Sequence, residues 1–309
     1  MSTTTNEATR CVGDGTRETA AFLGTPGEAV FACLHEPSEP PTALVVVCSS
    51  IGAEWKHNYR REVLLGRALA RAGVATVRFH YTGVGNSDDG TADFDRMVLD
   101  AALIERWALE RCGTVPVAYF GAKFGALVAA AAAARRPGAP LAAWGAALDG
   151  ASYFRELFRV ERVGRVAAAG SRLDGEALGP RESLERGLPA DLLGYTVEPA
   201  FYDSALTRSL ERELAAAPRV ARLFEIGEPR AALADVAARL AAHEVRVEIG
   251  TVPAQQNWWL HDKDWTADER RDSVIGLIEE TLQWLLSEVP APSTRHPSSS
   301  RPGTTRSSA

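Results

Sequence analysis

The stretch VPVAYFGAKFGA, residues 115–126, decides how the rest of the chain is interpreted. It begins with alternating β-branched and aromatic residues, which are typical of a buried strand. The run stops at Gly121, Lys123 stands between this glycine and Gly125, and an alanine-rich segment typical of a helix follows. We therefore predict a strand, a tight turn that presents Lys123, and a helix.

Similar alternation of strand and helix patterns surrounds this stretch. Continuously apolar runs are expected for strands buried on both faces of a parallel sheet. Such strands are predicted at 43–50, 74–82, 141–148, 220–227 and 245–250, and helices at 94–111, 231–242 and 268–286. Two short segments, 21–25 and 29–36, predict an antiparallel hairpin at the sheet edge. The fold class is α/β, with a mostly parallel doubly wound sheet.

The strand and helix alternation is interrupted once and is absent at both ends. Segments rich in Arg, Glu, Gly and Pro between 151 and 216 predict an inserted helical cap, so that 19–150 and 217–289 form the core. Residues 1–18 lack periodicity and are predicted to be a flexible arm. Residues 290–309 consist mostly of Ser, Pro, Thr and Arg and are predicted to be disordered.

The composition limits which binding partners and which cellular compartment are expected for this chain. The chain has 309 residues and a formal net charge of −6, which gives no basic surface for nucleic acid. No apolar run approaches the roughly 20 residues that span a bilayer, and the N-terminus has no apolar signal segment. The four cysteines lack CxxC spacing, which favours reduced thiols in the cytoplasm. We expect a small-molecule substrate, no metal or cofactor and no nucleic-acid or membrane partner, and we consider a homodimer as the assembly.

Several segments together resemble the α/β-hydrolase superfamily, in its serine-aminopeptidase-like branch that includes exosortase-system-associated hydrolases. The resemblance spans about residues 21–286 and rests on SSIGAE, FHYTGVGNSDD, FGAKFGA, LDGASYFREL and FEIGE. It implies an inserted cap and a nucleophile elbow of pattern GxSxG at residues 121–125.

The catalytic triad that this resemblance implies is altered here. Lys123 occupies the position of the serine nucleophile, and Pro229 and Arg230 follow FEIGE where an acid is expected. His261 lies between the last strand and the last helix, as the family histidine does. At least two of the three triad positions have changed, so ordinary Ser-His-Asp ester hydrolysis is not expected.

Lys123 offers other chemistry at the same position. The helix N-terminus and burial beneath a cap disfavour an ammonium ion, and a neutral lysine serves as a base or an amine nucleophile. It can then remove a proton beside a carbonyl or form a Schiff base, whereas a charged lysine binds a carboxylate or an enolate. The contrasting hypothesis is a degenerate site in which a neighbouring carboxylate pairs with the lysine and closes the pocket.

The remaining candidate site residues lie in loops around the elbow or enter the cap. From the resemblance, the backbone N–H groups of Phe124 and of Ser50 or Ile51 are expected to form an oxyanion hole. Glu54 and His57 are placed in the loop after the 43–50 strand. The proposed site residues are Lys123 and His261 as catalytic groups, and Phe124, Ser50, Ile51, Glu54, His57, Tyr81, Tyr153 and Trp258 as oxyanion or substrate-binding groups.

These residues favour a non-hydrolytic enzyme. The leading hypothesis is a lyase that eliminates acetate or another acyl group from a small metabolite, with Lys123 as base or electrostatic anchor. It resembles, more loosely, the acetate-eliminating α/β-hydrolase-like enzymes of tetronate antibiotic biosynthesis. Two alternatives stay open: an esterase that uses activated water or a serine at Ser49 or Ser50, and a binding or scaffold protein without catalysis.

Overall fold

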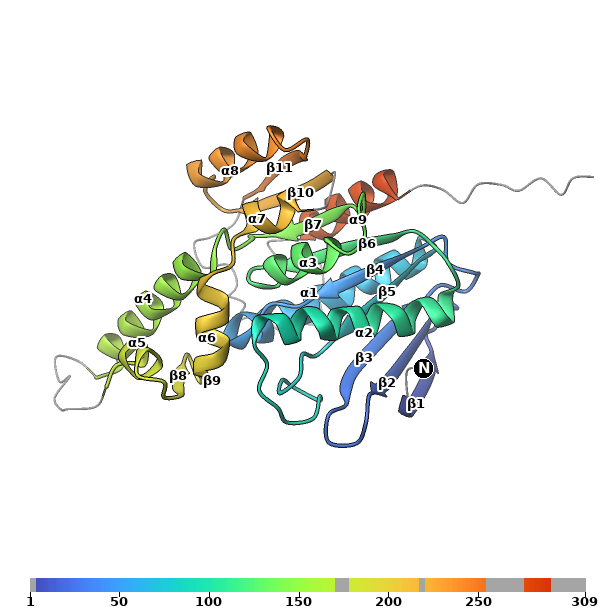
Figure 1. The fold of residues 1–309 in the computed structure, drawn as a ribbon. Coiled ribbons are helices and arrows are strands. Elements are labelled where there is room, and N and C mark those ends of the chain that lie inside the picture. The colour runs from blue at the N-terminus through green and yellow to red at the C-terminus, as the bar shows by residue number, and fades with distance from the viewer. Residues whose placement is uncertain (1–3, 170–177, 217–219, 254–274, 290–309) are drawn as a thin grey trace, which may run out of the picture.

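A computed structural model of the chain describes residues 4–169, 178–216, 220–253 and 275–289. Within these residues the fold is an α/β sandwich around one large sheet (Figure 1). The sheet order is β1-β2-β3-β5-β4-β6-β7-β10-β11, parallel from β5 to β11 and antiparallel at the β1-β2-β3 end. The predicted fold class, a mostly parallel sheet with helices on both faces, is confirmed.

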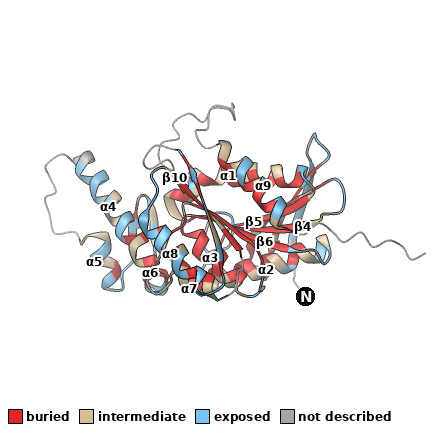
Figure 2. Cartoon of the chain, turned by 90° about the horizontal axis from the view of Figure 1, so that it is seen from above, coloured by how far each residue is buried: buried red, intermediate tan, exposed pale blue. Residues whose placement is uncertain are grey.

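The strands of the large sheet from β2 onward overlap the segments predicted from the sequence, whereas β1 does not. The strands of this sheet are β1 (Thr4–Cys11), β2 (Arg17–Leu23), β3 (Val30–Glu36), β4 (Ala43–Cys48), β5 (Val74–Phe79), β6 (Val117–Ala122), β7 (Leu141–Trp144), β10 (Val220–Ile226) and β11 (Arg246–Val252). Every residue of β4, β5, β6 and β7 is buried, as expected for parallel strands covered on both faces (Figure 2).

Helices cover both faces of the sheet. Those of the core are α1 (Gly52–Arg71), α2 (Phe94–Cys112), α3 (Gly125–Ala133), α8 (Ala231–Ala241) and α9 (Ile275–Glu288). Apolar side chains of α1 and α9 pack on one face, and those of α2, α3 and α8 pack on the other. The part of the predicted helix at 268–274 lies outside the described residues.

The cap lies at one end of the sandwich and contains a small hairpin as well as helices. Its elements are α4 (Gly150–Ala169), α5 (Pro180–Glu185), β8 (Ala190–Leu192), β9 (Tyr195–Val197), α6 (Pro199–Leu206) and α7 (Leu210–Ala215). The hairpin was not predicted, because strands of three residues carry too little periodicity to be recognised.

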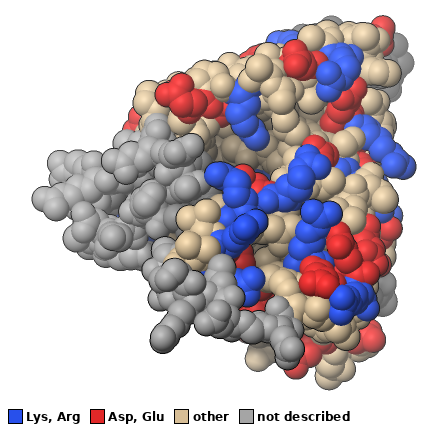
Figure 3. All heavy atoms as spheres, turned by 90° about the vertical axis from the view of Figure 1, so that its left-hand side faces the viewer, with Lys and Arg blue, Asp and Glu red and all other residues tan. Residues whose placement is uncertain are grey.

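Lys and Arg side chains gather near the middle of the face that this end presents (Figure 3). Several of the cap's arginines, such as Arg159, form ion pairs with acids one turn away.

The predicted flexible arm at 1–18 is wrong for most of its length. Residues of β1 pair antiparallel with β2 from Thr4↔Leu23 to Cys11↔Arg17, and β2 already begins at Arg17. The polar segment TTNEATRC has no apolar face, so periodicity fails to identify it as a strand. Its backbone nevertheless completes the hydrogen bonds of an edge strand, and the Arg10–Glu18 ion pair adds a cross-strand contact. The predicted disordered tail, 290–309, lies outside the described residues.

Candidate active site

Lys123 lies in a strained turn at the carboxyl end of β6. Its backbone φ is +54°, the left-handed region that a lysine rarely adopts. Glycines on either side make the turn sterically possible. A Cβ at Gly121 would lie 2.6 Å from the Ala126 Cα, and one at Gly125 would lie 2.7 Å from the Ser49 carbonyl carbon. The segment therefore has the strand, tight turn and helix predicted for it, with Lys123 at the tip of the turn.

A buried carboxylate faces this lysine. The Lys123 Nζ lies 3.2 Å from the Glu54 Oε1, and the exposed fractions of the two side chains are 21% and 3%. The topology brings them together. β4 and β6 are parallel neighbours with Cys48 opposite Gly121, and Glu54 is in the first turn of the helix that follows β4. Glu54 and His57 were expected in a loop; both lie on α1 instead, because the helix begins at Gly52, directly after the strand.

The cap supplies a third member of the cluster. The Tyr153 hydroxyl, from the first turn of α4, donates a hydrogen bond of 3.0 Å to the Glu54 Oε2. Burial raises the pKa of Glu54, while the charge of Lys123 and the Tyr153 hydrogen bond act in the opposite direction. Burial, and then the neighbouring Glu54 charge, raise the pKa of Tyr153 well above its usual value. Tyr153 is therefore a hydrogen-bond donor rather than a phenolate.

A cavity of about 310 Å³ opens beside this cluster, between the sheet end and the cap. Glu54 and Tyr153 belong to its lining, whereas Lys123 does not and contacts Glu54 beside it. Most of the other lining side chains are apolar, and include Ile51, Trp55, Val84, Met97, Phe154, Leu157, Leu192, Leu193, Val197 and Phe201. The cavity can therefore hold a small, largely apolar molecule with one polar end directed at the Glu54 carboxyl group. The cap hairpin residues were not foreseen, because only the packing of the cap brings them to the pocket. Trp55 was not foreseen either; it lies in the first turn of α1, beside Glu54.

The proposed oxyanion residues take different positions around the elbow. Phe124 is the residue before α3, and its ring is fully buried against Phe94, Tyr153 and Phe201. Ile51 lines the cavity at the N-terminus of α1.

The two serines considered as alternative nucleophiles are both buried. Ser50 accepts a hydrogen bond from Asn58 Nδ2 at 3.2 Å, and Ser49 donates one to Glu62 Oε2 at 2.7 Å. Neither side chain belongs to the lining of the cavity.

The other predicted site residues are not part of this cluster or lie beyond the described chain. The Tyr81 hydroxyl donates to the Ser49 carbonyl at 3.1 Å, so Tyr81 supports the strand end rather than the cavity wall. His57 lies half-buried on α1 and is absent from the cavity lining. His261 and Trp258 lie outside the described residues, as does the rest of the WWLHDKDW segment.

The position after β10, where the resemblance implies an acid, holds a separate ion pair. Arg230 Nη2 lies 2.6 Å from Glu225 Oε1 and also donates to the Ala146 carbonyl at 3.0 Å. The buried acid of β10 is therefore bound to Arg230. Among the described residues, no three His, Cys, Asp or Glu side chains gather as ligands for a metal ion. None of the described helices is long and apolar enough to cross a membrane.

Comparison with known proteins agrees with this fold. A family described as serine aminopeptidase, S33, matches residues 39–174. Est1E from Butyrivibrio proteoclasticus, in a structure with bound ferulic acid, has a TM-score of 0.60 at 16% identity, over 86% of this chain and 98% of its own. No curated protein sequence matches.

Two further solved structures have the same architecture. A thermostable carboxyl esterase from Bacillus coagulans has a TM-score of 0.58 at 14% identity, over 87% of this chain and 98% of its own. A serine hydrolase without a lid from Xanthomonas campestris has a TM-score of 0.54 at 17% identity, over 89% and 96%. At these sequence identities the structural similarity shows the α/β-hydrolase fold. It does not identify the reaction, which has to be inferred from the residues of the site.

Proposed function

We propose that this chain is an enzyme of the α/β-hydrolase type that eliminates a carboxylate from a small acyl-bearing molecule by proton transfer. The observation that carries the proposal is the Lys123–Glu54 pair: Lys123 occupies the position at which the resemblance implies a serine nucleophile, and Glu54 lines an apolar cavity. The strained backbone of Lys123 supports it as well, because such strain is retained where it positions a functional group.

The pair can hold its proton in two ways, and both suit an elimination. With the proton on Glu54, the Lys123 amine is the base that removes a hydrogen α to a carbonyl. With the proton on Lys123, the Glu54 carboxylate is the base and the ammonium stabilises the enolate. Burial raises the Glu54 pKa and so reduces the free-energy difference between the two arrangements.

The elimination step balances without a co-reactant. The base takes the α-proton, the C–H electron pair becomes the second bond of an alkene, and the bond from the β-carbon to oxygen breaks. The carboxylate departs with that electron pair, and the proton passes from the Lys123–Glu54 pair to solvent. By analogy with the resembling superfamily, the backbone N–H groups of Phe124 and Ile51 would hold the carbonyl oxygen while negative charge develops on it.

Ester hydrolysis is the second candidate, favoured by the esterase structures that share the fold. It needs a nucleophile other than the elbow residue. Ser49 and Ser50 are buried and bonded to neighbours, so activated water is the better option. The Glu54 carboxylate is one described base that could activate it, with His261 as the predicted second base.

A binding protein without catalysis is the third candidate. A buried carboxylate paired with Lys123 is what a degenerate site would contain. Against that hypothesis, the adjacent cavity of about 310 Å³ is open to a ligand rather than filled by side chains.

The experiment compares four proteins on two probes. Wild type, Lys123→Met, Lys123→Ser and Lys56→Met are incubated with a β-acetoxy ketone and with p-nitrophenyl acetate. Lys56 is the matched control, because it is an exposed lysine on α1 and one of only three lysines in the sequence. Elimination gives an enone and acetate, whereas hydrolysis gives a β-hydroxy ketone and acetate.

We expect enone from wild type and Lys56→Met, and a loss of about 100-fold or more in both Lys123 variants, the usual contribution of a positioned base. Hydroxy ketone as the sole product from wild type would favour hydrolysis instead. Borohydride trapping of an adduct on Lys123 would identify a Schiff base, and no adduct would leave the base and anchor roles.

A further inference from the structure

A second cavity, of about 440 Å³, lies beneath the middle of α1 at the antiparallel end of the sheet. Its lining comes from β1, β2, β3, β5 and α1 and shares no residue with the first cavity. It consists of Ala8, Thr9, Arg10, Glu18, Ala20, Phe31, Cys33, Tyr59, Val63, Arg67 and Arg78. One layer of aromatic rings separates the two cavities: the Tyr59 ring lies 5.5 Å from that of Trp55, which lines the first.

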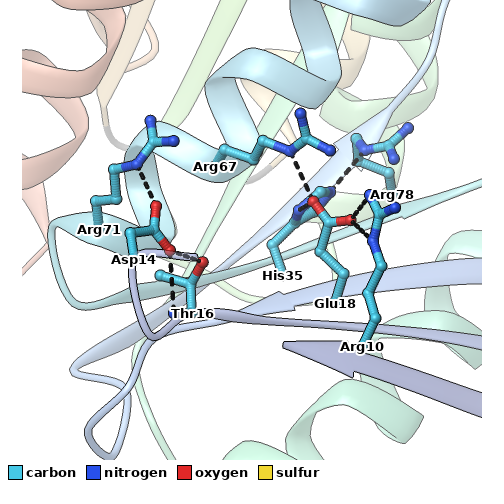
Figure 4. A network of polar contacts seen from close by, with 8 residues as sticks. All are labelled: Arg10, Asp14, Thr16, Glu18, His35, Arg67, Arg71 and Arg78. Carbon is cyan, nitrogen blue, oxygen red and sulfur yellow. Dashed lines mark hydrogen bonds and ion pairs between the residues drawn. The ribbon is translucent and has the colours of Figure 1, made fainter. Parts of the chain in front are cut away.

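The charges around this second cavity do not balance. Three arginines line it, against one carboxylate (Figure 4). Arg67 Nε donates to Glu18 Oε1 at 2.7 Å, and Arg10 Nε donates to Glu18 Oε2 at 2.7 Å. Hydrogen bonding from His35, followed by the two arginines, holds the pKa of Glu18 well below its usual range. Both carboxylate oxygens are therefore already engaged by Arg10 and Arg67.

Among the described residues, no carboxylate lies within ion-pair distance of Arg78, the third arginine of this cavity. This arginine is only 5% exposed, and its Nε donates to the His35 Nε2 at 3.0 Å. Burial lowers the pKa of His35, which is therefore a neutral partner. The Arg78 guanidinium also lies over the Tyr59 ring at 4.9 Å. The buried Glu62 carboxylate interacts with the Arg78 charge without forming an ion pair, and burying a charge without a direct partner is costly.

We propose that this cavity binds a small organic anion through Arg78, with Arg67 and Arg10 at its rim. A planar guanidinium presents paired N–H donors that match the two oxygens of a carboxylate or a phosphate. The apolar walls, which include Phe31 and Val63, suit an anion carried on a small apolar body rather than an inorganic ion alone. The site is distinct from the candidate active site and does not depend on its chemistry.

The test uses benzoate and inorganic phosphate as probes in isothermal titration calorimetry and thermal unfolding, with sodium chloride at matched ionic strength. The variants are Arg78→Gln, Arg67→Gln and the control Arg71→Gln. Arg71 lies one turn after Arg67 on α1 but pairs with Asp14, outside the cavity (Figure 4). Far-UV circular dichroism confirms that each variant is folded, and Arg67→Gln keeps the test valid should Arg78→Gln not fold.

We expect saturable binding to wild type and to Arg71→Gln, and affinity weaker by about tenfold or more in the two cavity variants, as the loss of a charged hydrogen bond implies. Binding of benzoate alone would indicate a carboxylate ligand, and binding of phosphate alone a phosphorylated one. Stabilisation that fails to saturate, or that is equal in all variants, would overturn the proposal.

Discussion

Replacing Lys123 by methionine removes the cation from the buried pair while keeping most of the side chain's volume. The Glu54 side chain is only 3% exposed, so without its partner it must either stay charged in an apolar environment or take up a proton. Leaving one partner of a buried pair unmatched costs about 3–5 kcal/mol. Taking up a proton removes the buried charge of Glu54, at a free-energy cost that depends on pH.

The direction of the pH dependence follows from a comparison of the Glu54 pKa in the unfolded and folded chains. In the unfolded chain Glu54 titrates near the ordinary glutamate pKa of 4.5, whereas burial raises that pKa in the folded protein. The folded state thus keeps a proton that the unfolded state releases, and stability falls as pH rises from 4.5 towards the folded pKa. Lys123 opposes this rise in wild type, so the Met variant loses stability over a wider pH range.

The size of the stability loss follows from the distance between the working pH and the ordinary glutamate pKa of 4.5. Holding the carboxyl protonated costs about 1 kcal/mol near pH 5 and, at about 1.4 kcal/mol per pH unit, close to 5 kcal/mol near pH 8. We therefore expect Lys123→Met to lose about 1 kcal/mol of unfolding free energy near pH 5 and about 3–5 kcal/mol near pH 8.

Urea unfolding followed by tryptophan fluorescence at both pH values measures this loss. Lys56→Met is the control and should match wild type, and adding Glu54→Gln to Lys123→Met should remove most of the pH dependence. Equal losses at both pH values, or no loss at either, would refute the assignment of Glu54 and Lys123 as a buried coupled pair.

Three further expectations concern the elbow, a thiol and the cap. Gly125→Ala forces a Cβ against the backbone carbonyls behind the elbow and should cost several kcal/mol in thermal unfolding, whereas Gly164→Ala, in open space on α4, should be neutral or slightly stabilising. Cys48 is fully buried and burial raises its pKa, so an aromatic disulfide reagent near pH 8 should reach it only after unfolding, while the exposed Cys11 reacts at once. Tyr153→Phe removes the hydroxyl that donates to the buried carboxylate of the pair and should cost about 1–3 kcal/mol near pH 8, less near pH 5; a larger loss at the lower pH would contradict this role.

The central sheet could be predicted because its parallel strands are continuous apolar runs and the turn at residues 121–125 has a distinctive glycine spacing. β1 escaped prediction for the opposite reason: its polar residues make an edge strand whose stability comes from pairing with β2. Apolar periodicity reports burial, and a strand exposed at the edge leaves little of that pattern.

The individual residues of the candidate site could be predicted from the sequence, but the contact between Lys123 and Glu54 could not. Lys123 stood out because of its position between glycines, and Glu54 could be named because it follows a strand that ends at the same edge. That these two meet depends on β4 and β6 being neighbours, which is a property of the sheet order rather than of either segment. The hydrogen bond from Tyr153 depends further on how the cap packs.

Exchange of α-hydrogen for deuterium in a simple ketone tests the proton-transfer role of the pair most directly, because a ketone without a leaving group can undergo only that step. Proton NMR in D₂O follows the exchange for wild type, Lys56→Met and Lys123→Met. The proposed mechanism predicts enzyme-dependent exchange by wild type and Lys56→Met, and a rate lower by about 100-fold or more in Lys123→Met. Exchange at the uncatalysed rate in wild type, or an unchanged rate in Lys123→Met, would contradict it.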